Sequence, residues 1–317
     1  MTPPRAKVTI YSGDLPASEA IERARGLLVG AQPRAVELHT WRPDLYAPEL
    51  RRLVPDVEIS VGVGVDSEAR DVAQGRQSIP AAVAELVRVA TRADAIGATS
   101  ITWNAEAAWK KPPTSAEVQR LYQLIRALLG EVATRFPRLR QEHTAYDHPT
   151  YHAAYPWRAW LGAGSPVQAS YAQVYAAPGG GLRAHRGALE AREARALDSW
   201  ATAVRVGWIR PDAPEGTEAD LVDLDWRPYY QLHHVPAVDT VASALEHPQC
   251  ALWAAPTRHD ADGREVVQVL AAIDRADLWD VRALQAAVGV EVDGAYGPIT
   301  HGAVVRWAAA RQGATPC

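Results

Sequence analysis

The sequence predicts an α/β protein, a (β/α)8 TIM-type barrel followed by a small helical domain. Three observations lead to this fold class. Strand-like runs alternate with helical runs along most of the chain, and eight such units can be counted. The third strand-like run, 57–65, is rich in Val, Ile and Gly, which is typical of parallel strands buried on both faces. The 317 residues suit one barrel of roughly 250 residues with an appendage, whereas an open doubly wound sheet is the alternative.

Apolar alternation and helical spacing define the elements in order. The predicted strands cover 7–12, 35–41, 57–65, a stretch that begins at 101, 139–144, 167–175, 220–226 and 250–254. The predicted helices cover 16–28, 44–53, 79–95, 114–132, 188–206 and 240–245, and the apolar segment 266–273 closes the set. Thr114 and Glu117 form a capping box ahead of apolar residues at helical spacing. We therefore assign 1–276 to a catalytic barrel and 277–317 to the small helical domain.

Composition and motifs exclude several classes of function. The net charge of -4 argues against a nucleic-acid partner, which normally meets a basic surface. Neither a phosphate-binding Gly-rich loop nor a Gly-x-Ser-x-Gly nucleophile motif follows a strand, so we expect no nucleotide, no cofactor and no metal. The cysteines, Cys250 and Cys317, imply no disulfide framework.

The first residues lead directly into a strand. They lack the basic and apolar segments of a signal peptide, and no apolar run reaches the roughly 20 residues of a membrane span. We expect a protein that is made in the cytoplasm and has no membrane span. A substrate outside the cell would then require release through another protein. The oligomeric state is left open.

Acidic and aromatic residues follow the predicted strands. In barrels of this class the reacting groups lie at the carboxyl ends of the strands. Flat rings at such a rim suit the apolar faces of sugars. The predicted strand ends carry Asp14, Trp41, Asp66, Asn104, Glu106, His143, Tyr146, Tyr175, Asp225, Trp226 and Trp253.

The stretch from Ile101 to Glu106 concentrates this chemistry. Side chains on a strand repeat every two residues, so Asn104 and Glu106 are expected on one side. A carboxylate at the end of an apolar strand is costly unless it is solvated, paired or used for chemistry. Trp103 and Trp109 add aromatic faces, and with the Asn104 amide they suit a sugar that carries an N-acetyl group. A strand-end Glu that merely meets water is the alternative.

The carboxyl-terminal segment contains a motif of its own. It combines Leu284-Gln285, Val292-Asp293-Gly294, Tyr296-Gly297, Thr300, Ala303, Val304 and Trp307 at fixed offsets. This pattern resembles the small helical peptidoglycan-binding domain. The resemblance implies that peptidoglycan glycan strands are the partner, whereas a helical cap that binds nothing is the alternative.

The fourth strand-like run resembles the signature of barrel glycosidases. Its Asn104-Ala105-Glu106 aligns with the Asp-x-Glu of family 25 muramidases and family 18 chitinase-like enzymes. The resemblance implies that Glu106 is the acid and that the residue two positions earlier orients the acetamido group of the substrate. Asn104 can hydrogen-bond this group but supplies no negative charge. Barrel and tail together resemble phage endolysins, which reach the wall after holin-type release.

A peptidoglycan glycosidase of lysozyme or glucosaminidase type is therefore the preferred hypothesis. Glycoside cleavage generally uses one protonated carboxyl group and a second carboxylate. Glu106 is the expected acid, which a pocket lined by Trp103 would keep protonated. Asp225 is the expected partner, with Asp223 or Asp14 as substitutes, and Asn104 completes the catalytic set. The expected substrate-binding residues are Asp14, Trp41, Trp103, Tyr146, Tyr175, Asp223, Trp226 and Trp253.

Two other functions stay open. His143, His148 and His152, with Asp147, have spacings that permit the metal site of an amidase or deacetylase, although no strong metal motif is present. A catalytically inactive wall-binding or phage-particle protein is the second, and Asn104 in place of an acid favours it.

Overall fold

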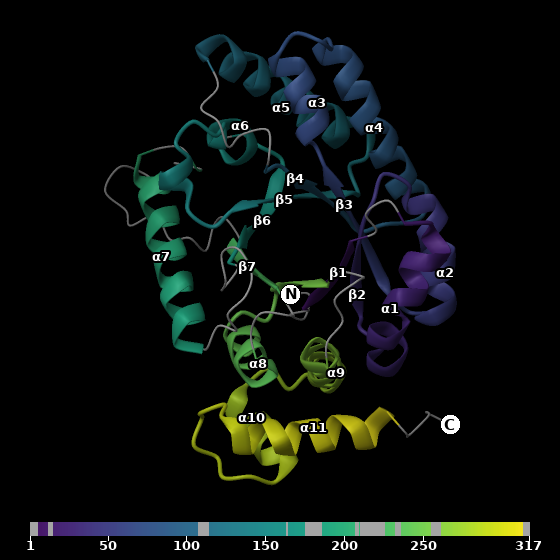
Figure 1. The fold of residues 1–317 in the computed structure, drawn as a ribbon, viewed down its shortest axis with the longest axis vertical. Helices are drawn as coiled ribbons and strands as arrows, with labels where there is room; N and C mark the ends of the chain where they lie inside the picture. Colours follow the sequence, from purple (N-terminus) through teal and green to yellow (C-terminus); the bar gives the residue numbers. More distant parts are fainter. Residues whose placement is uncertain are drawn as a thin grey trace.

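The structure, a computed structural model, describes residues 6–11, 15–106, 114–162, 164–174, 186–206, 209, 226–231, 236–254 and 261–312. Within these residues eight parallel strands pair in chain order, and the first also pairs with the eighth to close a barrel. The predicted (β/α)8 barrel is confirmed, and the open-sheet alternative is wrong. Figure 1 shows helices around the barrel and two further helices beside α8 and α9.

The observed elements follow the predicted order. The strands are β1 (Lys7–Tyr11), β2 (Ala35–His39), β3 (Glu58–Gly64), β4 (Ser100–Asn104), β5 (Arg140–Tyr146), β6 (Val167–Gln173), β7 (Trp226–Gln231) and β8 (Ala251–Ala254). The helices are α1 (Ala17–Ala31), α2 (Pro43–Leu53), α3 (Asp66–Ala73), α4 (Ile79–Ala95), α5 (Ser115–Arg135), the 3-10 helix η2 (Pro149–His152), α6 (Trp157–Leu161), α7 (Arg186–Arg205), α8 (Ala237–Glu246), α9 (Ala261–Ala276), α10 (Val281–Val288) and α11 (Pro298–Gln312). The capping box predicted at Thr114 is present at the start of α5. No helix in these ranges has the length and apolar character needed to cross a bilayer.

The seventh strand differs from the prediction. It was expected over 220–226, but β7 begins at Trp226 and runs to Gln231. Pro228 lies inside it and has no N–H to give to a ladder, so this segment lacks an ordinary strand signal. Helix α3 is also additional, since it begins at Asp66 directly after β3. The carboxyl end of β7 is therefore Gln231.

The barrel wall has an apolar outer face and a charged inner face. Outward side chains such as Ile101 are fully buried in one cluster with helical residues such as Leu128. Inward, the Lys7 Nζ lies 2.6 Å from Glu37 Oε2 and 2.9 Å from Glu142 Oε2. It also lies 3.2 Å from the Thr102 hydroxyl. These partners come from β2, β4 and β5, so the lysine reaches across the interior.

The inner charges are paired, as buried charges must be. Arg140 lies 2.6 Å from Glu142, on the oxygen that Lys7 does not contact. Burial alone would raise the pKa of Glu142, yet the charges of Lys7, Arg140 and Arg227 outweigh burial and lower this pKa to about 2. We call this buried network of Lys7, Glu37, Arg140 and Glu142 the ionic floor of the barrel.

The tail, which comprises α10, α11 and the loop between them, folds around Gln285. This buried side chain donates from Nε2 to Asp293 Oδ1 (2.6 Å) and to the Ala295 carbonyl (3.0 Å), and its Oε1 accepts the Gly294 N–H (2.9 Å). Leu284 beside it is fully buried. One amide thus joins the Leu-Gln and Val-Asp-Gly parts of the sequence motif.

The tail packs on the outer wall of the barrel (Figure 1). His301 of α11 places Nε2 at 2.8 Å from Glu265 Oε1 of α9, and its Nδ1 lies 2.9 Å from the Tyr296 hydroxyl. Leu284 and Val304 belong to the same apolar cluster as the barrel residues around α9. The two helical layers therefore share a core, and the last residue of α9, Ala276, is also the last residue assigned to the barrel from the sequence.

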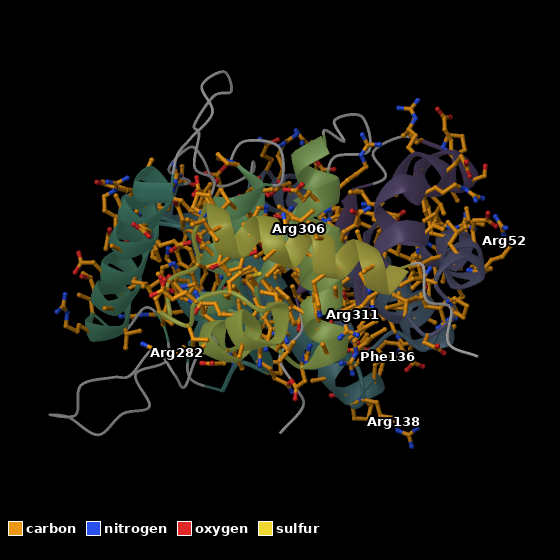
Figure 2. All side chains as sticks on the ribbon, turned by 90° about the horizontal axis from the view of Figure 1, so that it is seen from below. Arg52, Phe136, Arg138, Arg282, Arg306 and Arg311 are labelled. Carbon is orange, nitrogen blue, oxygen red and sulfur yellow. The ribbon has the colours of Figure 1, made fainter. Side chains whose placement is uncertain are left out.

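Arginines cover the exposed side of the tail. Arg282, Arg306 and Arg311 are solvent-exposed, and Figure 2 labels them on the side of the molecule that carries the tail. The Arg311 guanidinium lies 4.6 Å from the centre of the half-buried Trp307 ring. This face combines positive charge with an aromatic ring.

Candidate active site

Asn104 ends β4 on the inner face of the barrel, and Glu106 follows it. Thr102, two residues earlier, donates its hydroxyl hydrogen to Glu37 Oε2 at 2.6 Å inside the barrel. Because strand side chains alternate, Asn104 continues this face toward the carboxyl end. Asn104 and Glu106 are both half-buried. The amide and the acid therefore stand at the mouth of the barrel, above the ionic floor.

Trp103 does not line this mouth, contrary to expectation. Its ring is fully buried in the cluster between the barrel and the helices, and its Nε1 donates to Gln141 Oε1 at 3.1 Å. The same alternation that directs Asn104 inward directs Trp103 outward. The prediction that Trp103 binds substrate and surrounds Glu106 with apolar atoms is wrong.

Three side chains hold Glu106 in place. Gln173 of β6 donates its Nε2 hydrogen to Glu106 Oε1, and Tyr146 of β5 donates its hydroxyl hydrogen to the Glu106 carbonyl. The Glu106 N–H donates to Asp66 Oδ1 at 2.9 Å. The hydrogen bond from Gln173 therefore distinguishes the two carboxyl oxygens of Glu106.

Space is open beside Asn104. Gly64 pairs with Asn104 across β3 and β4, and no atom lies within 4 Å of the position that a Cβ at Gly64 would take. Two residues earlier on the same face, a Cβ at Gly62 would lie 2.7 Å from His39 Nδ1. Asn104 Oδ1 is buried and accepts no hydrogen bond from any described residue. The site therefore holds a buried, unpaired acceptor on β4 and an open position on the paired residue of β3.

Aromatic rings border the mouth on the β5 side. Tyr146 stacks on His152 of η2, with ring centroids 3.6 Å apart and planes 16° apart. Burial, with the charges of Asp66 and Glu106, raises the pKa of Tyr146, so its hydroxyl keeps its proton. Tyr151 of η2 is 79% exposed, which leaves a free ring face at this rim. Such rings suit contact with a sugar.

The other predicted site residues have separate outcomes. Trp41 is half-buried, its ring packs on the core cluster, and its carbonyl accepts an Arg92 hydrogen at 2.8 Å. Trp226 was expected at the carboxyl end of the seventh strand but begins β7, opposite Ser170. Trp253 lies in β8, opposite Thr9. Asp14, Trp109, Tyr175, Asp223 and Asp225 lie outside the described residues.

The structure adds Gln173 and His39 to the residues predicted from the sequence. Gln173 ends β6 and reaches Glu106 across the mouth. His39 ends β2, two residues after Glu37, and the charge of Glu106 acts on it. The only sequence signal for His39 was its alternation with Glu37 on one strand, and Gln173 had none.

The predicted metal alternative is not assembled from its four residues. His143 is fully buried, with Nδ1 at 2.9 Å from the Ser170 hydroxyl and Nε2 at 2.7 Å from the Tyr155 hydroxyl. Asp147 pairs with Arg192 at 2.6 Å, and His152 stacks on Tyr146. Within the described ranges no three His, Cys, Asp or Glu side chains converge as a metal site. His143 therefore serves the core.

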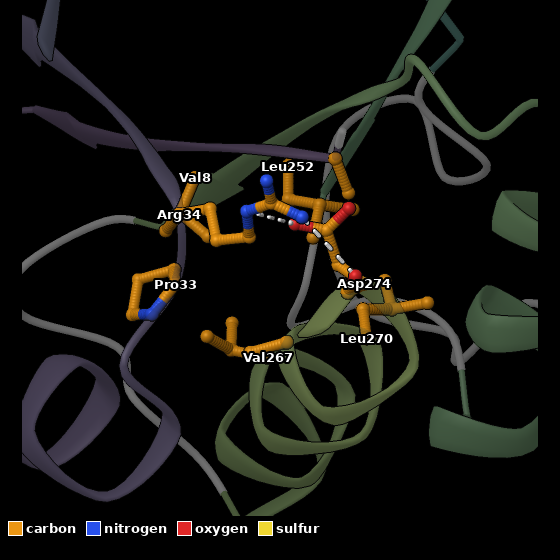
Figure 3. Close-up of a pocket in the computed structure, with 9 residues that line it drawn as sticks. Val8, Pro33, Arg34, Leu252, Val267, Leu270 and Asp274 are labelled. Atoms are coloured by element: carbon orange, nitrogen blue, oxygen red, sulfur yellow. Dashed lines mark hydrogen bonds and ion pairs between the residues drawn. The ribbon is translucent and has the colours of Figure 1, made fainter. Parts of the chain in front are cut away.

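A small pocket lies at the other end of the barrel (Figure 3). Val8, Arg34 and α9 residues such as Val267 line it. Arg34 Nε lies 3.6 Å from Asp274 Oδ2. This pocket is at the amino-terminal ends of β1 and β2, away from the end where barrels of this class carry their reacting groups.

Comparisons with known proteins show the fold. No protein-family model and no curated protein matches the sequence. Among solved structures, a GH18 chitinase from Pseudoalteromonas aurantia is 10% identical with a TM-score of 0.49, covering 84% of this chain and 100% of the chitinase. A GH18 chitinase from Cycas revoluta in complex with (GlcNAc)3 is 14% identical with a TM-score of 0.46, covering 72% of this chain and 68% of the chitinase.

A third similar structure is a D-allulose 3-epimerase from Methylomonas sp., 11% identical with a TM-score of 0.44, covering 79% of this chain and 84% of the epimerase. At these identities the similarity concerns the fold alone, and it does not choose a reaction. The fold and the site together define a (β/α)8-barrel protein with an acid and an amide at the carboxyl end of β4.

Proposed function

We propose that the protein is a glycosidase that cleaves the glycan strands of peptidoglycan, with Glu106 as the acid. The observation that carries the proposal is the pairing of a held carboxyl group with an unpaired amide oxygen beside an open space. The resemblance of Asn104-Ala105-Glu106 to the signature of barrel glycosidases supports the same reading.

The acid step follows from the contacts of Glu106. Gln173 occupies Oε1, so the proton on Oε2 is the one available to the glycosidic oxygen. The hydrogen bonds of Tyr146 and Asp66 fix the backbone on both sides of this side chain. Asp225 remains the predicted second carboxylate.

Asn104 gives the site its substrate class. Its buried Oδ1 can accept the N–H of an N-acetyl group, which repairs an unsatisfied polar atom. The acetyl group would lie at Gly64, where an added Cβ has no atom within 4 Å. N-acetylated sugars are the repeating units of the wall glycan, so the Asn104 amide and the space at Gly64 together favour this polymer over unsubstituted glucans.

The tail supports a wall substrate in the manner of a phage endolysin. Gln285 joins the two parts of the motif that resembles a peptidoglycan-binding domain. The exposed arginines of this tail can bind the carboxylates of wall peptides. A barrel that cuts and a tail that binds would then act on one polymer.

The test measures reducing ends released from purified cell walls. Glu106→Gln should abolish release while the melting temperature stays unchanged, and Glu131→Gln, on the exposed side of α5, should leave release unchanged. If Glu106→Gln still releases reducing ends, Glu106 is not the catalytic acid. New amino groups without reducing ends would instead identify an amidase, and wall binding without any product would identify an inactive binding protein.

A further inference from the structure

Tyr151 differs from the other aromatic residues that follow β5, because its ring is exposed. Tyr155 and Trp157, a few residues further along the chain, are 3% and 1% exposed, whereas Tyr151 is 79% exposed. No other Tyr, Trp or Phe whose side chain the structure describes is more than 38% exposed, the value of Tyr122. The ring of Tyr151 therefore adds little to the core.

The backbone that carries Tyr151 is held on both sides. Thr150, the residue before it in η2, is bound to the Ser199 hydroxyl of α7 through its N–H (3.1 Å) and through its own hydroxyl (2.7 Å). The carbonyl of His152, the residue after it, accepts the indole hydrogen of Trp157 at 3.0 Å. A side chain on a fixed backbone loses less freedom when a ligand covers it, so more of the contact energy appears as affinity.

His148 orients the Tyr151 ring. The two rings meet edge to face, with centroids 5.3 Å apart and planes 80° apart, and the His148 carbonyl accepts the Tyr151 N–H at 3.1 Å. His148 Nε2 in turn lies 3.4 Å from Asp147 Oδ2, which also receives the Arg192 Nε hydrogen at 2.6 Å. The edge contact thus sets the direction of the ring, and its high exposure leaves apolar surface open to solvent.

A series of ring contacts joins η2 to Glu106. Tyr146 donates its hydroxyl hydrogen to the Glu106 carbonyl, and its ring stacks on His152 with centroids 3.6 Å apart. His152 is the next residue after Tyr151, and consecutive Cα atoms are about 3.8 Å apart. Tyr151 therefore belongs to the same rim as the rings beside Glu106. It extends this rim toward solvent, since His152 is half-buried and Tyr151 is exposed.

We propose that Tyr151 binds a sugar of the glycan away from the bond that is cut. The inference rests on the proposed glycosidase function and adds a binding residue to it. The apolar C–H face of a sugar ring and the flat face of a phenol ring both leave water when they stack. A glycan has to extend beyond the sugars around Glu106 to reach this ring. The protein should therefore bind long glycan strands more tightly than short fragments.

A sugar fits Tyr151 better than a protein partner does. A stable protein interface covers about 800 Å² on each partner. Among the described residues, the other exposed large apolar side chains, such as Leu45 of α2 and Val206 after α7, lie on other elements. A single ring that continues the rim of the proposed substrate site suits one sugar unit.

The first arm of the test measures the binding of N-acetylglucosamine oligomers by NMR titration, with Glu106→Gln in every protein so that no oligomer is cut. Tyr151→Ala should weaken binding of the hexamer about 10-fold and leave binding of the dimer within about twofold. A 10-fold loss corresponds to about 1.4 kcal/mol, which matches the burial of about 55 Å² of apolar surface. Tyr151→Phe keeps the ring and should keep the affinity for the hexamer.

The matched control is Tyr122→Ala, which removes another exposed ring from α5 and should change neither affinity. The second arm follows the ring signals of labelled tyrosines, with Tyr151 assigned through Tyr151→Phe. The hexamer should shift the signals of Tyr146 and Tyr151, whereas the dimer should shift that of Tyr146 alone.

Three results would overturn the inference while the proposed function stands. They are an unchanged affinity of Tyr151→Ala for the hexamer, an equal loss for dimer and hexamer, and a loss of binding to whole cell walls with unchanged binding of the hexamer. The last would assign Tyr151 to a wall peptide. If the hexamer binds through Tyr151 but the protein with Glu106 intact releases no reducing ends, the proposed function is wrong and the sugar-binding role of Tyr151 stands.

Discussion

Gln173 donates a side-chain hydrogen bond to Glu106 from a strand 67 residues further along the chain. The two residues end β6 and follow β4, and β5 lies between these strands in the barrel. The bond therefore spans part of the mouth and fixes which carboxylate oxygen is free. The orientation of the Glu106 side chain therefore depends on barrel closure, because Gln173 comes from another strand than β4.

Removing this donor should slow the reaction without unfolding the protein. Gln173→Leu should lower kcat on cell-wall glycan by about 10- to 100-fold, because Glu106 becomes charged as it gives up its proton and a hydrogen bond to a charged group contributes about 1.5–3 kcal/mol. Initial rates of reducing-end release measure the effect. Gln123→Leu, on the exposed side of α5, is the matched control and should not change the rate. An equal loss in both variants would show that the Glu106 contact is not the cause.

Filling the space beside Asn104 should block the substrate. A Cβ at Gly64 would have no atom within 4 Å, so Gly64→Val should change the melting temperature by no more than a few degrees. Its hydrolysis of N-acetylated glycan should fall by at least about 100-fold, since the side chain would occupy the acetyl position. Gly130→Val on α5, where an added Cβ would also have no neighbour within 4 Å outside the local helix backbone, should keep full activity. An active Gly64→Val would place the acetyl group elsewhere.

The ionic floor should make stability fall in acid. The folded pKa of Glu142, about 2, lies below its ordinary value of 4.5. Its contribution is therefore fully present above pH 4.5 and is lost as the pH falls toward 2. Urea unfolding at a series of pH values should show this loss, and Glu142→Gln should flatten the curve in this window. A curve of the same slope in both proteins would assign the acid sensitivity to other carboxylates.

The hydrogen bonds of the Gln285 side chain should be needed for the fold of the tail. Gln285→Leu leaves the Gly294 N–H and Asp293 without their partner. We expect it to lower the free energy of unfolding by about 1–3 kcal/mol, the cost of buried polar groups left unpaired, and to weaken co-sedimentation with cell walls. Glu291→Leu, an exposed change in the same loop, should do neither. Unchanged sedimentation in a destabilised Gln285→Leu would place wall binding outside the tail.

The sequence predicted the fold better than the site. Alternating strand and helix patterns identified the barrel, because each strand had to bury an apolar outer face whatever its partners were. Pro228 concealed β7, since a residue without an N–H is an unusual strand member. Trp103 was misassigned because its nearness to Glu106 in the chain outweighed the alternation that turns adjacent strand residues to opposite faces.

The contacts of Glu106 could not be predicted from the chain. Its partners are Gln173, Tyr146 and Asp66. They contact Glu106 only because barrel closure and strand stagger bring β6, β5 and the start of α3 to the same level along the barrel axis. Sequence reasoning can find which residue types follow the strands. It has no signal for the layer in which each side chain ends, so it assigned no role to His39.

The shared core of α9 and α11 limits how this protein can be re-engineered. Truncation after Ala276 would expose the apolar surface of α9 that α11 covers. A different domain fused at this point would therefore need a helix with a complementary apolar face. For the same reason, a polymer bound by Arg306 would reach the barrel mouth in one orientation and at one fixed distance from the tail.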